Sequence, residues 1–148
     1  MSDASAAASP TSAFLAMAID AATRAGRMQL DALGSAFAVR KKGVIDLVTE
    51  IDLAIERMCR ALVAERYPDH DVLGEEFGAP DAGRPPARHC WIVDPIDGTT
   101  NFAHGMPIFC ASVALEIDGR VDVAAVYDPT RDELFTAERG RGAWLNGG

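Results

Sequence analysis

The feature that most constrains the fold is a change of hydrophobic period near the middle of the chain. Apolar residues in the first half, such as Phe14, Ala18 and Ala22, recur at helical spacing. The second half instead holds short apolar runs separated by turn residues, among them the tight-hairpin pair Asp118-Gly119. This order predicts a layered α/β fold in which two helices pack on a mainly antiparallel sheet.

The first predicted helix opens at Ser9-Pro10, a capping residue followed by the proline that favours the first helical position. It should end near Gly34, and residues 37–48 are expected to form a loop or a short hairpin. Residues 1–8 are small and polar, so we expect a disordered tail there. The remainder, residues 9–148, is long enough for one domain with its own core.

The second predicted helix begins at Thr49 and ends before Tyr67-Pro68. Thr49 and Asp52 fit a capping box, in which the side chain three residues after the cap reaches back to it. Ile55 and Leu62 then lie on one face of the helix. This interpretation gives Asp52 a structural role that competes with any chemical role.

The strands are predicted from short apolar runs that end at turn residues. An irregular surface linker, residues 78–88, separates the first strand from the others. The strands are expected at residues 71–73, 90–93, 108–117, 121–127 and 134–137. An exposed sheet edge at the last of these could support a homodimer.

The charge balance limits the classes of partner. The chain has a formal net charge of -8, and its longest basic cluster is the short run Arg40 to Lys42. Nucleic-acid binders usually carry a basic patch, so we expect no nucleic-acid partner. An acidic protein can still bind a phosphate ester if bound cations reverse the local field.

The cysteines and the N-terminal segment favour a cytoplasmic protein that does not enter a membrane. Cys59, Cys90 and Cys110 lack the close spacing of a zinc site or a dithiol motif, and reduced thiols are expected. The first residues have no basic stretch followed by an apolar one, as a secretory signal would. No apolar run is long enough to span a bilayer.

The strongest chemical signal is the segment Trp91–Phe102, with the sequence WIVDPIDGTTNF. An apolar strand runs into two acids, Asp94 and Asp97, which would repel each other unless a cation or hydrogen-bond donors lie between them. From Gly98 onward, backbone N–H groups and hydroxyls could bind a phosphate, particularly if a short helix begins there. Asp, Pro, Gly and Thr also form ordinary turns, so the motif by itself leaves that alternative open.

Two weaker segments carry further acids. Gly74-Glu75-Glu76 follows the first predicted strand, and Asp46–Asp52 precedes or begins the second helix. Ligands that are all oxygens favour Mg²⁺ over Zn²⁺. Two such ions, about 3.5–4 Å apart, can clamp a phosphoryl group and activate a water molecule. A covalent aspartyl-phosphate is not expected, because Pro95 stands where the Asp-x-Asp nucleophile loop of haloacid dehalogenase-type phosphatases has its first acid.

Taken together, three segments resemble the inositol monophosphatase family in order and spacing. They are DLVTEID at 46–52, GEE at 74–76 and WIVDPIDGTTNF at 91–102. The first helix and the late segment 140–147 are similar as well, so the resemblance covers nearly the whole chain. It implies a sugar-phosphatase fold and Mg²⁺-dependent hydrolysis of a phosphate monoester, inositol monophosphate first.

The resemblance also implies residue roles. Glu75, Asp94 and the main-chain carbonyl of Ile96 would hold a first Mg²⁺, and Asp94 and Asp97 a second. Glu75 and Thr99 would position the attacking water, with Asp52 supporting the Thr99 hydroxyl. The substrate-binding residues implied are Glu75, Ile96, Asp97, Gly98 and Thr99. Lys41 would match a lysine in a loop beside the site.

The chain departs from the family pattern in its length. Family members continue for roughly another hundred residues, close to one further domain. That part carries a WDxAAG-type motif whose aspartate completes the second metal site, and this chain has no such motif. We therefore expect residues 9–148 to be the N-terminal metal-binding domain, without the C-terminal domain. Two alternatives remain: an inactive half-domain that at most binds Mg²⁺ or a partner, and another substrate such as histidinol phosphate or a different sugar phosphate.

Overall fold

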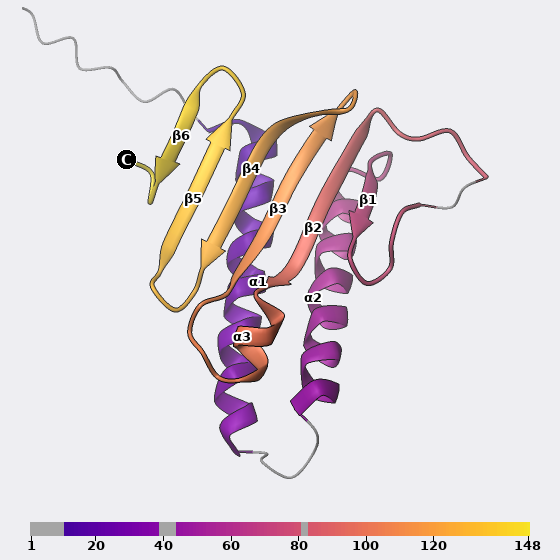
Figure 1. The fold of residues 1–148 in the computed structure, drawn as a ribbon. Coiled ribbons are helices and arrows are strands. Elements are labelled where there is room, and N and C mark those ends of the chain that lie inside the picture. The colour runs from indigo at the N-terminus through magenta and orange to yellow at the C-terminus, as the bar shows by residue number, and fades with distance from the viewer. Residues whose placement is uncertain (1–10, 39–43, 81–82) are drawn as a thin grey trace, which may run out of the picture.

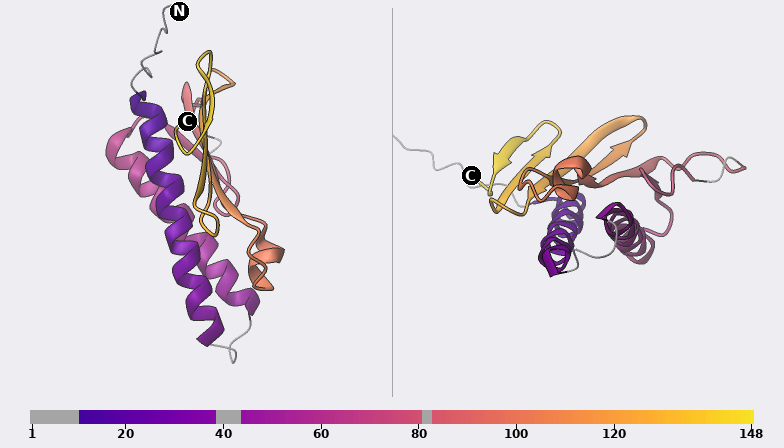
Figure 2. Two further views of the ribbon diagram at one scale, coloured as in Figure 1. Left: turned by 90° about the vertical axis from the view of Figure 1, so that its left-hand side faces the viewer. Right: turned by 60° about the horizontal axis from the view of Figure 1, so that its bottom comes forward.

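The structure is a computed structural model, and it describes residues 11–38, 44–80 and 83–148. Two long helices lie side by side on one face of a six-stranded sheet (Figures 1 and 2). The helices are α1 (Ala13–Ala38), α2 (Val44–Arg66) and the short α3 (Thr99–Ala103). The strands are β1 (Asp71–Gly74), β2 (His89–Asp97), β3 (Cys110–Ile117), β4 (Arg120–Asp128), β5 (Glu133–Glu138) and β6 (Gly142–Leu145).

The sheet follows the order of the chain, β1-β2-β3-β4-β5-β6. Among the strands of the described residues, β1 and β2 pair in parallel, and each of the other neighbouring pairs is antiparallel. The prediction of two helices on a mainly antiparallel sheet is therefore confirmed. None of the described helices is both long enough and apolar enough to cross a membrane.

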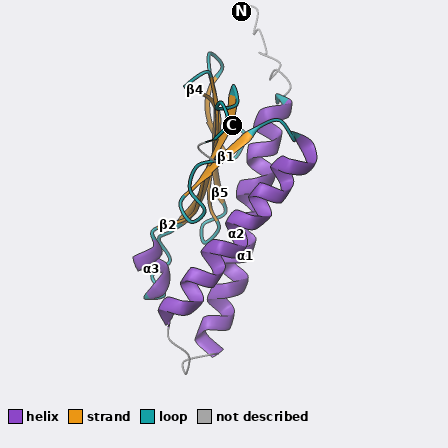
Figure 3. Ribbon diagram, turned by 90° about the vertical axis from the view of Figure 1, so that its right-hand side faces the viewer, coloured by secondary structure: helices purple, strands orange, loops and turns teal. Residues whose placement is uncertain are grey.

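The core lies between the sheet and the two long helices. Alternate residues of the central strands point to the helices, so Trp91, Val113 and Leu115 are almost fully buried while their neighbours are only half-buried. Small residues on α1, such as Ala18 and Ala22, let that helix approach the sheet closely. Figure 3 shows this layering from the side, with both helices on the same face.

Both predicted helix starts were wrong. The Leu15 N–H donates to Ser12 Oγ at 3.2 Å, which makes Ser12 the cap of α1; Ser9-Pro10 lies outside the described residues. Helix α1 also continues past Gly34 to Ala38. Helix α2 begins at Val44, so Thr49 and Asp52 lie within the helix and cannot form its capping box.

The predicted loop at residues 37–48 was therefore wrong at both its ends, while residues 39–43 lie outside the described part. The physical reason is that nothing from Val44 to Arg66 breaks a helix, since the segment holds neither glycine nor proline. Thr49 and Asp52 match the capping pattern by their spacing alone, although the helix already begins at Val44. The tail predicted at 1–8 also lies outside the described residues.

Two corrections concern the strands. Strand β2 does not end at Val93 but runs to Asp97, so the two acids belong to the strand and not to a loop after it. Strand β5, expected as an exposed edge, pairs with β4 on one side and with β6 on the other. The dimerisation surface suggested for residues 134–137 is therefore covered by β6, a strand that the sequence patterns did not predict.

Candidate metal and phosphate site

The candidate site lies where the parallel strands β1 and β2 end side by side. Gly74 at the end of β1 is level with Val93 of β2, so Glu75 comes next to Asp94. Helix α2 passes close to both strands and packs against α3, which follows β2 directly. The carboxyl ends of adjacent parallel strands meet at one edge, and this is how acids from separate segments come together here.

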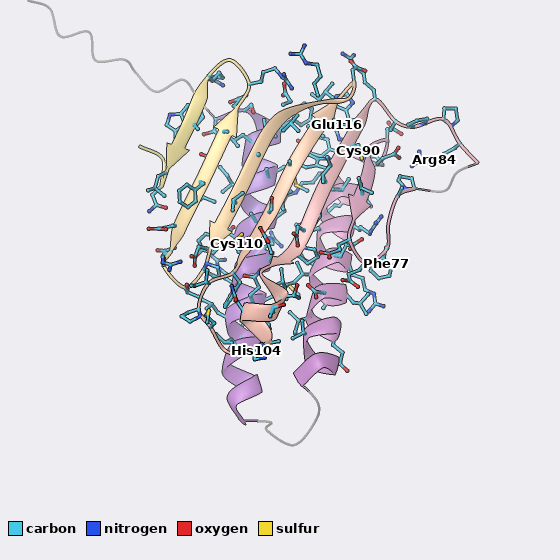
Figure 4. All side chains as sticks on the ribbon, in the orientation of Figure 1. Phe77, Arg84, Cys90, His104, Cys110 and Glu116 are labelled. Atoms are coloured by element: carbon cyan, nitrogen blue, oxygen red, sulfur yellow. The ribbon has the colours of Figure 1, made fainter. Side chains whose placement is uncertain are left out.

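A bulge in β2 places Asp94 and Asp97 on the same face of the sheet. Asp94 is opposite Ser112 and Asp97 is opposite Cys110, so a three-residue step on β2 matches a two-residue step on β3. In a regular strand, residues three apart point to opposite faces. The Cys110 thiol, at 3.9 Å from Asp97 Oδ2, lies on this face, and Figure 4 places it near the point where β2 leads into α3.

Gly98 makes the turn from β2 into α3. Its φ of 98° is left-handed, and a Cβ there would lie 2.9 Å from the carbonyl oxygen of Ile108. A non-glycine residue would therefore be both strained and crowded. A short helix does begin at this point, and Thr99 is its first residue. The first N–H groups of any helix lack partners within the helix, which makes this turn suited to an anion.

Burial and neighbouring acids raise the pKa of two carboxyl groups of the site, Asp52 and Asp94. Burial, followed by the charges of nearby carboxylates, raises the pKa of Asp52 to about 7. Those carboxylates belong to Glu76, Glu75, Asp94 and Glu56. Burial, together with the charges of Glu75 and Asp97, raises the pKa of Asp94 to about 6. Four of the predicted residues, Asp52, Glu75, Asp94 and Asp97, thus share one electrostatic environment.

Asp94 lies at the centre of this group. After burial, the neighbouring Glu75 is the main cause of the raised Asp94 pKa, so the two side chains lie close together. The Oδ1 of Asp94 is buried and has no hydrogen-bond partner among the described residues. A buried carboxylate oxygen without a donor is costly, and a cation would remove that cost.

These observations test whether Mg²⁺ fits the residues present. The donors are hard oxygens with excess negative charge, as Mg²⁺ prefers. Across residues 11–38, 44–80 and 83–148, no group of three or more His, Cys, Asp or Glu side chains is arranged so that it could hold a metal ion. The predicted sets contain only two carboxylates for each ion, and Mg²⁺ usually keeps several waters. The residues therefore fit Mg²⁺ by donor type and charge, while the number of ions stays a prediction.

The other predicted residues are placed as follows. Ile96 is buried in the bulge beside the acids, and the exposed Asp97 ends the strand. Thr99 begins α3, the helix that packs against α2, but its predicted contact with Asp52 stays a prediction. Lys41 lies outside the described residues. His104, which was not among the predicted site residues, caps the end of α3 at the surface, where its Nδ1 lies 2.7 Å from the Thr100 carbonyl oxygen.

Two residues that contact the site segments were not predicted. Gln29 of α1 donates from Nε2 to the carbonyl oxygen of Pro95 at 2.7 Å, between the two acids of β2. Glu56 of α2 accepts hydrogen bonds from the loop that carries Glu75. Both Gln29 and Glu56 are polar residues within an otherwise apolar helical face, which indicates a buried hydrogen bond. The sequence does not show which group is the partner in that bond.

A profile of the inositol monophosphatase family matches residues 11–148. The chain belongs to this family. The inositol monophosphatase of Mesembryanthemum crystallinum is 45% identical over 146 residues, covering 93% of this chain and 52% of that protein. The Nus factor SuhB of Pseudomonas aeruginosa is 43% identical over 135 residues, covering 90% of this chain and 50% of that protein.

The solved structures agree with the family assignment. The inositol monophosphatase of Anabaena (Nostoc) sp. PCC 7120 superposes with a TM-score of 0.75 at 37% identity, covering 90% of this chain and 46% of that chain. The prediction of an inositol monophosphatase fold is confirmed. The chain spans about half the length of the relatives it matches.

Proposed function

We propose that this chain is the metal-binding part of a Mg²⁺-dependent phosphatase that hydrolyses a phosphate monoester, with inositol monophosphate as the first candidate substrate. The observation that carries the proposal is the meeting of Glu75, Asp94 and Asp52, with the buried Asp94 Oδ1 left without a donor. Membership of the inositol monophosphatase family supports the reaction class.

Four groups would hold the metal. Glu75, Asp94 and the Ile96 carbonyl are assigned to a first Mg²⁺, and Asp94 with Asp97 to a second. When bound, the ions would offset the negative charge of the site, polarise the phosphoryl group and make water a better nucleophile. The bulge in β2 favours this assignment, because it turns Asp94 and Asp97 toward the same side.

The remaining chemistry belongs to the protein's own groups. Glu75 and Thr99 orient the attacking water, and Asp52 holds the Thr99 hydroxyl through a hydrogen bond. The N–H groups of Gly98 and Thr99 donate to phosphate oxygens, in a turn whose backbone has no room for a side chain. The displacement is in-line, and the alcohol leaves on the side opposite to the water.

Other substrates and roles are also proposals. Histidinol phosphate or another sugar phosphate remains an alternative substrate, since the described residues do not identify the alcohol. The absence of a nucleic-acid partner stays a prediction, because one relative is named a Nus factor. Cytoplasmic location, absence of membrane binding and a homodimer are likewise predictions for the whole protein.

The test measures phosphate release from inositol monophosphate by the 148-residue chain with and without Mg²⁺. We expect Asp94→Asn to lower the Mg²⁺-dependent rate by about 100-fold or more, as loss of a central electrostatic group does. Asp118→Asn, in an exposed hairpin turn, is the matched control and should leave the rate unchanged.

Calorimetric titration with Mg²⁺ separates the proposal from its main alternative. Mg²⁺ binding that needs Asp94, without any turnover, would favour the inactive half-domain. If Asp94→Asn binds Mg²⁺ and releases phosphate as the unchanged chain does, the metal role assigned to Asp94 is wrong.

A further inference from the structure

The loop that carries Glu75 is folded around a carboxylate from α2. Glu56 is fully buried, and its Oε2 accepts the N–H of Glu76 at 2.8 Å. Its Oε1 accepts the N–H of Phe77 at 3.2 Å. Two successive backbone N–H groups thus converge on one carboxylate directly after Glu75. The backbone of this loop is fixed by α2 and not only by its own turn.

Arg60 holds both the carboxylate and the two ends of the loop. Its Nη2 lies 2.8 Å from Glu56 Oε1, and its Nε donates to the same oxygen at 2.9 Å. Arg60 also donates to the carbonyl oxygen of Val72 at 3.2 Å and to that of Gly78 at 2.9 Å. One guanidinium group therefore ties the strand before the loop to the residue that closes it.

The Glu56 carboxylate is packed tightly against the backbone of Gly74. A Cβ at Gly74 would lie 2.0 Å from Glu56 Oε1, so any side chain at this position would displace the carboxylate. Gly74 and Gly78 also exchange backbone hydrogen bonds of 3.3 and 3.1 Å, which close the loop. Glu75 is the first residue inside this closed loop, and its side chain is exposed.

We propose that Glu56 and Arg60 are positioning residues that set the place of Glu75 relative to Asp94. The proposal rests on the function proposed above, since it concerns how the chain prepares that site. Asp52 and Glu56 are four residues apart on α2, so they share a face of the helix. Asp52 lies near the acids of the site. Glu56 instead accepts hydrogen bonds from the N–H groups of the loop, and its charge is balanced by the ion pair with Arg60. Glu56 is therefore not a metal ligand.

The test uses Glu56→Gln, which keeps the shape of the side chain but removes its charge and half of its acceptor capacity. Arg60→Lys is a second variant that keeps the positive charge but cannot reach the carboxylate and both carbonyls at once. Glu65→Gln removes the same charge from an exposed position on the same helix and serves as the matched control. Val63→Ala, a core substitution on α2, controls for a general loss of stability.

Two measurements are made on the 148-residue chain: amide hydrogen exchange at Glu76 and Phe77, and calorimetric affinity for Mg²⁺. We expect faster exchange at these two amides in Glu56→Gln and in Arg60→Lys. The Mg²⁺ affinity should fall by about 10–100-fold, as it does when residues that orient metal ligands are replaced. Glu65→Gln should match the unchanged chain, and Val63→Ala should keep its Mg²⁺ affinity despite a lower melting temperature.

The outcomes are distinguishable. Unchanged Mg²⁺ affinity in both Glu56→Gln and Arg60→Lys overturns the positioning role, as does an equal loss of affinity in Val63→Ala. If the unchanged chain binds no Mg²⁺, the proposed metal site is wrong, and the exchange data alone decide whether the pair orders the loop. Should Glu56→Gln fail to fold, Arg60→Lys decides the question.

Discussion

At the scale of single residues, Gln29 has the contact that links α1 to the candidate site. Its Nε2 donates to the carbonyl oxygens of Pro95 at 2.7 Å and Cys110 at 3.1 Å, which lie on facing strands. These strands are out of regular register here because of the bulge. The fully buried amide nitrogen of Gln29 thus supplies a donor to two carbonyl groups beside the bulge.

We therefore predict that Gln29→Leu destabilises the protein by about 1–3 kcal/mol, since buried carbonyls lose their donor. Urea unfolding measures the effect. Thr23→Val, which removes a local hydrogen bond within α1, is the control and should cost less than about 0.5 kcal/mol. Equal stability of Gln29→Leu and the unchanged chain would contradict the role given to Gln29.

Sequence patterns identify some of these residues but not others. The acids of β2 and the glycine after them stand in one short segment, where local spacing already indicates their chemistry. Gln29 and Glu56 act on partners 66 and 20 residues away in the chain. No local pattern contains those partners, so their roles follow only from the packing of α1 and α2 on the sheet.

At the scale of elements, a cluster of stacked aromatic rings packs between the helices and the sheet, at the end of β2 that lies far from the candidate site. The rings of His70 and His89 stack at 4.4 Å, and those of His70 and Tyr67 at 4.7 Å. The buried Trp91 donates from Nε1 to His70 Nδ1 at 3.0 Å. His70 can accept this bond only while Nδ1 carries no proton.

This stack predicts a loss of stability in acid. Burial, followed by the nearby His89, lowers the pKa of His70 below its usual value of 6.5. The unfolded chain therefore binds a proton before the folded chain does, and the contribution of His70 to stability is lost as the pH falls below about 6.5. Thermal melts across this range should show a weaker acid dependence in His70→Gln than in the unchanged chain.

His104→Gln is the control for that experiment, because His104 lies at the surface at the end of α3. Its melting temperature should follow the unchanged chain at each pH. An acid dependence that is identical in all three proteins would show that the His70–Trp91 hydrogen bond does not limit stability in acid.

The elements themselves were predicted unevenly, for a physical reason. The hairpin at Asp118-Gly119 was found because both residues adopt positive φ, a local demand that the sequence displays. The start of α2 was missed because Thr49 and Asp52 match a cap locally. The bulge in β2 was missed because it depends on which residues of β3 lie opposite, and that is information from another segment.

At the scale of the whole molecule, excess negative charge is concentrated where β1 and β2 end. The chain has a net charge of -8, and the charges of neighbouring acids add to burial in raising the pKa of Asp52 and Asp94. The folded pKa values of Asp52 and Asp94 lie above the ordinary value of 3.8, so these two groups hold extra protons in the folded state between pH 4 and 7. The stability contributed by these groups is greatest in acid and falls as the pH rises through about 6 and 7.

This charge distribution predicts that Mg²⁺ and pH act together. Mg²⁺ should raise the melting temperature by a few degrees at about pH 8, where the acids are ionised, and by much less at about pH 5. Asp52→Asn should reduce the pH dependence measured without Mg²⁺. Sodium chloride at equal ionic strength controls for screening. An equal effect of Mg²⁺ at both pH values would contradict binding by these carboxylates.

The bulge in β2 has a consequence for how related sequences can vary. Deleting one residue between Asp94 and Asp97 would restore a regular ladder opposite Ser112 and Cys110, yet it would also remove the extra residue that Gln29 holds. Adding one residue would turn Asp97 toward the buried face. Substitutions between the two acids should thus be tolerated far better than insertions or deletions. In related sequences, the number of residues between these acids should stay constant even where their identities differ.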